Sequence, residues 1–190
     1  MDWYELLKTR LAPIALPETF EEHSIAAAVI VPLGMNLESN RTEVLLTKRT
    51  AVVETHKNEV GFPGGVYAVE DGKSLLITAL RETEEEIGVK RGDLELLGQL
   101  SPVPTLNNVK IFPFVAKMQF PYPFVLNPSE VAKLIHVPLD LLLEKGFQSI
   151  EVVGENYKVK SIGLEFEGEL IWGASAKILD EFRSVLLSEP

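Results

Sequence analysis

Apolar residues recur at helical spacing near both ends of the chain. Within residues 1–22, Asp2 is placed to cap a short helix that Pro13 ends. Its apolar positions follow the i, i+3, i+4 pattern and are Trp3, Leu6, Leu7 and Leu11. Residues 173–187 are amphipathic in the same way. The two patterns predict an N-terminal helical arm and a C-terminal helix.

A third helical pattern lies in the middle of the chain. It begins after Ser74, which is suited to an N-cap, and ends at Ile87, where Gly88 can take the left-handed conformation that closes a helix. One side carries an apolar stripe of Leu76, Leu80, Thr83 and Ile87. At about 100° per residue, the side away from the stripe groups three carboxylates, Glu82, Glu85 and Glu86. This helix therefore has an apolar face and an acidic face.

Short apolar runs bounded by proline, glycine or asparagine predict strands. They cover residues 25–31, 43–48, 94–100, 109–118 and 131–137. A short helix should open with Pro138 at its first position and end at Gly146. Residues 148–153 and 157–166 resemble the two arms of a hairpin. Strands and helices mixed in this order predict an α/β (α+β) fold, with a mixed sheet flanked by helices.

Composition and charge narrow the class of protein. The 190 residues are 46% hydrophobic and 24% charged, which predicts one folded domain spanning residues 1–190. The formal net charge of −10 argues against nucleic acid as a partner, because proteins that bind it carry a basic face. An acidic protein that binds a small phosphate compound needs bound cations or local Lys and Arg side chains.

The chain has no cysteine, which excludes a disulfide framework, a thiolate zinc site and a cysteine nucleophile. Its most apolar stretch, residues 25–33, is far shorter than the roughly 20 residues of a membrane span. The N-terminus lacks the pattern of a signal peptide. We expect no membrane association and a cytoplasmic location. The oligomeric state is left open, a homodimer being one alternative.

The acidic face of the central helix is unfavourable for stability alone. Carboxylates near a helix C-terminus oppose its dipole by roughly 0.3–1 kcal/mol each. Glu82 also lies three and four residues from Glu85 and Glu86, where like charges repel by about 0.2–0.5 kcal/mol per pair. Hard cations such as Mg²⁺ or Mn²⁺ take such all-oxygen sites, and carbonyls of the Gly64-Gly65 turn could contribute. The alternative is a solvated acidic helix face.

Residues 81–89, Arg-Glu-Thr-Glu-Glu-Glu-Ile-Gly-Val, follow Phe-Pro-Gly-Gly at 62–65 and resemble the Nudix box, G x5 E x7 R E U x E E x G U with U aliphatic. The matching positions are Arg81, Glu82, Glu85, Glu86, Gly88 and Val89, with Thr83 in place of an aliphatic residue. The first half departs from the pattern. It is two residues longer, and Asp71 stands where the first glutamate would fall.

The resemblance implies a Nudix-type α/β/α sandwich and hydrolysis of a nucleoside diphosphate linked to another group, with Mg²⁺ or Mn²⁺. Glu82, Glu85 and Glu86 would be metal ligands, assisted by the carbonyl of Gly64. Arg81 would hold the glutamates by ion pairing. Metals would neutralise the diphosphate and activate the water that attacks phosphorus.

The general base is less defined. Glu130, just before a predicted strand, matches a position where Nudix enzymes often carry a base or a further metal ligand. Without the resemblance, it would be taken for a surface glutamate at a strand start. His56, in the loop before the glycines, is a second candidate, although a lone loop histidine is more often solvated.

A narrower resemblance concerns the substrate. Residues 45–65 agree in spacing with LLTxR[SA]x3Rx3Gx3FPGG, a motif of the coenzyme A pyrophosphatase branch. Three positions differ: Thr50 replaces Ser or Ala, Glu54 replaces Arg, and Asn58 replaces Gly. Residues 127–131 and 171–174 also resemble that branch. The side chains left for the substrate and its phosphates would be Lys48, Arg49, Lys57 and Phe62, the lysines being alternatively ordinary surface charge.

We therefore predict a pyrophosphohydrolase that cleaves coenzyme A (CoA) or its derivatives to 3′,5′-ADP and 4′-phosphopantetheine or its acyl form. One alternative is another nucleoside diphosphate derivative, such as ADP-ribose, an NDP-sugar or NADH. The other is a non-catalytic Nudix-fold nucleotide sensor, which would have no need of the intact acidic set. Glu54 leaves the substrate open, because an anion in place of a cation near a polyphosphate reverses the sign of that contact.

Overall fold

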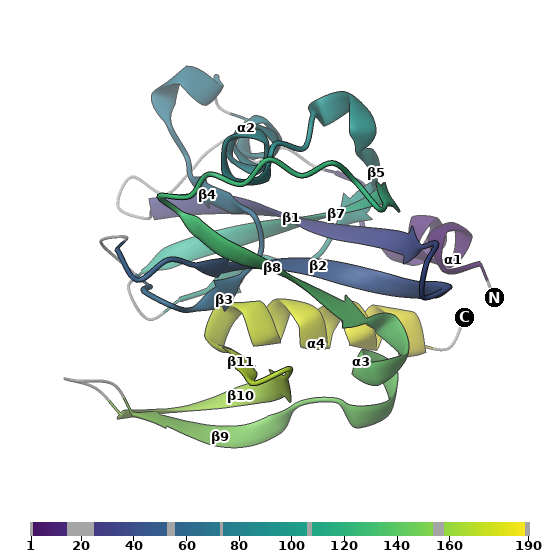
Figure 1. Ribbon diagram of the computed structural model, residues 1–190, viewed down its shortest axis with the longest axis vertical. Coiled ribbons are helices and arrows are strands. Elements are labelled where there is room, and N and C mark those ends of the chain that lie inside the picture. The colour runs from purple at the N-terminus through teal and green to yellow at the C-terminus, as the bar shows by residue number, and fades with distance from the viewer. Residues whose placement is uncertain are drawn as a thin grey trace.

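The computed structural model describes residues 2–14, 25–52, 56–72, 74–105, 108–153 and 158–188. A mixed sheet lies at its centre, with strand order β3-β2-β1-β7-β5 (Figure 1). Parallel pairing of β1 with β7 covers both strands from end to end, and the other pairs are antiparallel. These strands are β1 (Ile25–Asn36), β2 (Arg41–Arg49), β3 (Val60–Gly61), β5 (Glu95–Gln99) and β7 (Val109–Phe120). The expected mixed sheet is confirmed.

Three further strands of the same sheet pair with individual strands outside this main order. They are β4 (Gly64–Val66) against β1, β6 (Val103–Pro104) against β7, and β8 (Val131–Pro138) against β2. The sequence pattern did not indicate β3, β4 or β6, which are only two or three residues long. It also ended the first strand at residue 31, whereas β1 continues to Asn36.

The central strand β1 is buried on both faces of the sheet. Its alternating side chains contribute to two separate cores, because successive residues of a strand point to opposite faces. Helix α2 (Leu75–Ile87) covers one face. The other is covered by α4 (Gly173–Leu187), with α1 (Trp3–Arg10) and α3 (Leu139–Lys145) beside it (Figure 1). The result is the expected sandwich of helices about a mixed sheet.

A second sheet of three antiparallel strands packs against α4 (Figure 1). It consists of β9 (Gln148–Val153), β10 (Lys158–Phe166) and β11 (Glu169–Trp172). The pairing of β9 with β10 confirms the predicted hairpin, whose tip, 154–157, lies outside the described residues. Strand β11 was not expected.

The predicted helix caps are present. Asp2 Oδ1 accepts hydrogen bonds from the N–H groups of Tyr4 and Glu5, and Ser74 Oγ accepts one from Ile77. Gly88 ends α2 at φ 75°. One detail was wrong, because Pro138 is the N-cap of α3 rather than its first residue. The apolar stripe of α2 is wider than predicted: Leu76 is partly buried against the core, and Leu75 and Ala79 are fully buried beside it.

The expected N-terminal arm is helical over α1, and residues 15–24 lie outside the described part of the chain. Among the described residues, no helix combines the length and the apolar character needed to cross a membrane.

Candidate metal and active site

Gly64 and Gly65 lie in a short edge strand instead of the expected turn. The Ile30 N–H donates to the Pro63 carbonyl at 2.9 Å, so Gly64 takes the next position, which is not bonded to β1. Its N–H and carbonyl therefore both point away from β1. The N–H reaches Glu86 Oε2 at 3.2 Å.

Both glycines are required by close approach. A Cβ on Gly64 would lie 2.2 Å from the Ala28 carbonyl oxygen, and the residue has a φ of 149°. A Cβ on Gly65 would lie 2.4 Å from the Glu82 carboxyl carbon. The missing side chains thus let β4 pack against β1 and let the Glu82 carboxylate rest on the backbone of Gly65.

Glu86 is the buried member of the acidic face, with 3% of its surface exposed. Burial raises its pKa to about 7, and repulsion from Glu130 and Glu82 adds to the rise. The Gly64 N–H bond and the Arg49 guanidinium, 3.5 Å away, oppose it. Burial also raises the pKa of Glu82, with Glu85 and Glu130 contributing in the same direction. Arg81 opposes the rise for Glu82 as Arg49 does for Glu86, but burial and the neighbouring carboxylates outweigh both cations.

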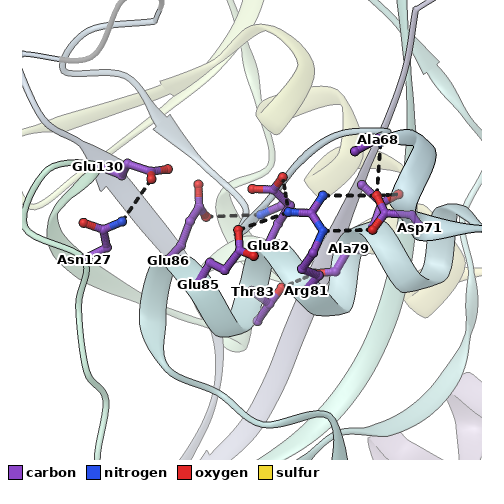
Figure 2. Close-up of polar contacts among 12 residues, drawn as sticks. Ala68, Asp71, Ala79, Arg81, Glu82, Thr83, Glu85, Glu86, Asn127 and Glu130 are labelled. Atoms are coloured by element: carbon purple, nitrogen blue, oxygen red, sulfur yellow. Dashed lines mark hydrogen bonds and ion pairs between the residues drawn. The ribbon is translucent and has the colours of Figure 1, made fainter.

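Arg81 organises the outer part of the site (Figure 2). Its Nη1 donates to Glu82 Oε1 at 2.9 Å and to Glu85 Oε2 at 3.0 Å, as the sequence predicted. Its Nε and Nη2 bind Asp71, a buried residue in the 3₁₀ turn Val69–Asp71, which sequence reasoning gave no role. The role of Asp71 could have been inferred from its position, because it stands where the first glutamate of the Nudix box would fall.

Asp71 is fully provided with hydrogen-bond donors. Besides Arg81, the Thr78 hydroxyl donates to Oδ2 at 2.8 Å and the Ala68 N–H at 3.1 Å. The hydrogen bonds from Arg81 are the main reason that the pKa of Asp71 is lowered to about 2. The same pairing raises the pKa of Arg81. Thr83, the departure from the aliphatic position, is buried with its hydroxyl donating to the Ala79 carbonyl at 2.6 Å.

The segment that carries Glu130 is fastened at both ends. The Asn127 N–H donates to the Glu86 carbonyl at the end of α2, and the Thr50 N–H donates to the Glu130 carbonyl, both at 2.9 Å. The Asn127 side-chain amide donates to Glu130 Oε1 at 3.0 Å. Figure 2 shows the Glu130 side chain next to that of Glu86. The structure thus brings Glu130 to the acidic face, on a separate segment of the chain.

The chemistry of these groups fits a hard divalent cation. The carboxylates of Glu82 and Glu86 lie against the backbone of Gly64 and Gly65, which together form a glycine cradle, and Glu130 is near enough to repel both. Carboxylate and backbone carbonyl oxygens are the ligands that such a cation takes. Glu85 is the outermost of the set, its side chain 56% exposed and bonded to Arg81. Over the described ranges, no three His, Cys, Asp or Glu side chains form a ready-made metal site. A cation held by two of these carboxylates would take its remaining oxygen ligands from water or a substrate phosphate.

The predicted substrate-binding residues separate in the structure. Arg49 faces Glu86, but Lys48 points to the other sheet face, where its Nζ lies 2.7 Å from Glu169 of β11. Phe62 was expected at the substrate but is 7% exposed and packs in the core on the α4 side of the sheet. Lys57 is exposed in the turn that begins at residue 56, just after residues 53–55, which lie outside the described part of the chain. Only Arg49 of the four contacts the acidic face.

Asn58 and Glu54 both depart from the motif of the coenzyme A pyrophosphatase branch, but the structure describes only Asn58. Asn58 takes φ 59°, a left-handed conformation that asparagine tolerates better than most residues, so it can replace the motif's glycine. Glu54 lies outside the described residues. Nearby, the His56 Nδ1 lies 2.8 Å from Glu59, a bond that raises the pKa of His56 and points its ring at that carboxylate.

The NUDIX domain family model matches residues 23–151, which contain β1, the glycine cradle, α2 and Glu130. The chain belongs to the Nudix family. Two relatives are each named uncharacterized Nudix hydrolase NudL. The one from Photorhabdus laumondii is 31% identical over 166 residues, 87% of each chain. The one from Yersinia pestis is 33% identical over 154 residues, 80% of this chain and 75% of the relative.

Solved Nudix structures share the fold. A MutT/nudix family protein from Enterococcus faecalis superposes with a TM-score of 0.60 at 21% identity. That match covers 91% of this chain, which spans 65% of the Enterococcus chain. A C. elegans Ap4A hydrolase gives a TM-score of 0.51 at 19% identity, over 60% of this chain and 80% of the other. The family and the fold make this protein a Nudix diphosphatase, an enzyme of a family that generally uses divalent metal ions.

Proposed function

We propose that this Nudix hydrolase cleaves the diphosphate of coenzyme A or its derivatives, with Mg²⁺ or Mn²⁺, to give 3′,5′-ADP and 4′-phosphopantetheine or its acyl form. The observation that carries the proposed reaction is the placement of Glu82 and Glu86 on the glycine cradle of β4. Both carboxylates are drawn out of water, and they face Glu130 without enough positive charge to balance them.

The residues of the site divide the work between binding and orientation. Glu82, Glu85, Glu86 and the Gly64 carbonyl would hold the cation, which when bound neutralises the diphosphate and lowers the pKa of a coordinated water. Arg81 keeps the carboxylates of Glu82 and Glu85 on the same side of α2.

Glu130 is proposed as the general base. The Asn127 amide fixes one of its oxygens, which orients the carboxylate toward the acidic face. From there Glu130 would accept the proton of the attacking water. Its segment is anchored by backbone bonds to the end of α2 and to Thr50, the residue after β2, so the base is held close to rigid elements.

The proposed substrate rests on the motif in residues 45–65. Asn58 preserves the backbone that the motif's glycine would take, and Arg49 lies beside Glu86, where it can reach a phosphate of a bound diphosphate. Lys57 is a further candidate for the phosphates. Lys48 and Phe62 are not part of the proposed binding set, because one is paired with Glu169 and the other is in the core. A cytoplasmic location and a homodimer stay predictions.

A substrate panel tests both the reaction and its specificity. CoA, acyl-CoA, ADP-ribose, an NDP-sugar and NADH would each be incubated with Mg²⁺ or Mn²⁺, and the products weighed by mass spectrometry. We expect 3′,5′-ADP and 4′-phosphopantetheine from CoA as the preferred reaction. Faster turnover of ADP-ribose than of every CoA species would overturn the proposed substrate and leave the reaction class intact.

The assignment of the site is tested on the same helix. Glu86→Gln should abolish most of the turnover and weaken Mn²⁺ binding. Glu84→Gln is the matched control, since Glu84 is exposed on another side of α2 and pairs with Lys90. Equal activity of wild type and Glu86→Gln would show that the metal site lies elsewhere.

A further inference from the structure

Two arginines approach the acidic face, and they are held very differently. Arg81 makes hydrogen bonds of 2.8 to 3.1 Å to three carboxylates, a locked arrangement. Arg49 lies 3.5 Å from Glu86 Oε1, longer than a charge-assisted hydrogen bond, and its buried Nε has no hydrogen-bond partner within the described ranges. Arg49 therefore neutralises Glu86 without being fixed to it.

The alternation of side chains along β2 directs Arg49 to this position. Successive residues of a strand point to opposite faces, so Lys48 reaches Glu169 on one face of the sheet and Arg49 reaches Glu86 on the other. Beside them, Lys48 pairs with Lys133 of β8 and Arg49 pairs with Val131, so the extra residue of a β-bulge, Ala132, lies on β8.

The charges around Glu86 give Arg49 a defined electrostatic role. In the part of the chain that the structure describes, Arg49 is the one cation within ion-pair distance of Glu86. Glu82 and Glu130 are the carboxylates that repel it. A divalent cation bound to Glu86 would stand within a few ångströms of the guanidinium, where two positive charges repel strongly.

We propose that Arg49 is an internal counter-ion of Glu86 that competes with the divalent cation for this carboxylate and so limits the affinity of the site for metal. Binding of the cation releases the guanidinium from Glu86 and leaves it for a phosphate of the substrate. Arg49 is thus a positioning residue for the metal site before it is a substrate contact. The inference rests on the proposed function, because it requires Glu86 to ligate the cation.

Calorimetric titration with Mn²⁺, without substrate, measures this competition directly. Arg49→Gln should bind Mn²⁺ about fivefold or more tightly than wild type, because a like charge is removed from beside the cation. Arg49→Lys keeps the charge and should stay within about twofold of wild type. Lys133→Gln is the matched control, since it removes one positive charge from the adjacent strand on the face toward Glu169. It too should stay within about twofold.

A second measurement follows Arg49 in the wild-type protein. The Arg49 Nε–H is buried, which favours its observation in a ¹⁵N correlation spectrum. Its resonance, assigned from its loss in Arg49→Lys or by through-bond experiments, should shift as Mg²⁺ saturates the wild type. The Glu86→Gln variant, titrated to the same Mg²⁺ concentration, should show no such shift.

The outcomes separate this inference from the proposed function. If Glu86→Gln binds Mn²⁺ as tightly as wild type, the proposed metal site fails and the competition fails with it. If Glu86→Gln weakens binding but Arg49→Gln does not tighten it, only the role of Arg49 is overturned. An Arg49 resonance that stays in place at saturating Mg²⁺ overturns that role as well.

Discussion

Arg81 holds Asp71 by two hydrogen bonds, from Nε to Oδ1 at 2.8 Å and from Nη2 to Oδ2 at 3.1 Å. This pairing fixes the guanidinium so that its third nitrogen, Nη1, reaches Glu82 and Glu85. The 3₁₀ turn before α2 is thereby connected to the metal-facing carboxylates, although Asp71 itself is turned away from them. Asp71 influences the site through the direction in which it holds Arg81.

The first prediction concerns Asp71→Asn. Loss of the carboxylate should lower the free energy of unfolding at pH 7 by about 2–3 kcal/mol, somewhat less than for a fully buried ion pair, because Arg81 is partly exposed. Turnover should fall as well, since Arg81 no longer orients Glu82. Thermal melts and steady-state kinetics would measure the two effects. Asp71→Glu restores the residue type of the box and should recover more activity than Asn. An Asp71→Asn protein with wild-type stability would contradict this account.

The same pair predicts how stability depends on acid. The pKa of Asp71 is about 2 in the folded protein and 3.8 ordinarily, so its stabilising effect is fully present above pH 4 and is lost as the pH falls toward 2. This amounts to about 2 kcal/mol, at 1.36 kcal/mol per pKa unit. Denaturant unfolding between pH 5 and 2 should show a steeper loss for wild type than for Asp71→Asn.

The sequence predicted correctly those elements that are defined by residues close together in the chain. Capping residues and a 3.6-residue period define α2, and the spacing of its glutamates placed Arg81 against Glu85 correctly. Strand β4 could not be predicted in this way, because Gly64 and Gly65 have low strand propensity and are strands only through pairing with β1. Asp71 was missed because its partner lies ten residues further along the chain, across an irregular turn.

The separation of the predicted substrate contacts has a related cause. Lys48 and Arg49 are adjacent and both basic, so composition gave them the same role, but as successive residues of β2 they point to opposite faces of the sheet. Phe62 belongs to a recognised motif, yet its side chain fills the core on the α4 side of the sheet. A motif identifies which residues recur together, and only the fold decides which of them face the site.

Gly65→Ala should separate stability from metal binding. The added Cβ would meet the Glu82 carboxyl group at 2.4 Å, the far end of a flexible side chain, which can move aside. We expect little change in melting temperature but a loss of about 10- to 100-fold in metal affinity or activity, because a ligand is displaced. Gly92→Ala is the matched control, since a Cβ there meets nothing within 4 Å. Retention of full Mn²⁺ affinity by Gly65→Ala would contradict the cradle.

Glu86→Gln should be more stable than wild type when a chelator removes divalent cations. The pKa of Glu86 is about 7 in the folded protein and 4.5 ordinarily, so folding favours the protonated form. Its ionisation therefore lowers the free energy of unfolding as the pH rises from about 4.5 through 7, by at most about 3 kcal/mol. Melts in EDTA should show the variant gaining over wild type at pH 8 and little at pH 4.5. If the variant gains no stability over wild type at pH 8, ionisation of Glu86 does not destabilise the folded protein.

Glu130→Gln tests the general base. The amide side chain can still occupy the same space beside Asn127, so folding and Mn²⁺ binding should change little. The variant cannot accept a proton, and kcat should fall by about 10²- to 10⁴-fold, with KM changed far less. Glu165→Gln, an exposed change on β10, is the control and should leave kcat unaltered. A Glu130→Gln enzyme within twofold of wild type would assign the base elsewhere, with His56 the next candidate to substitute.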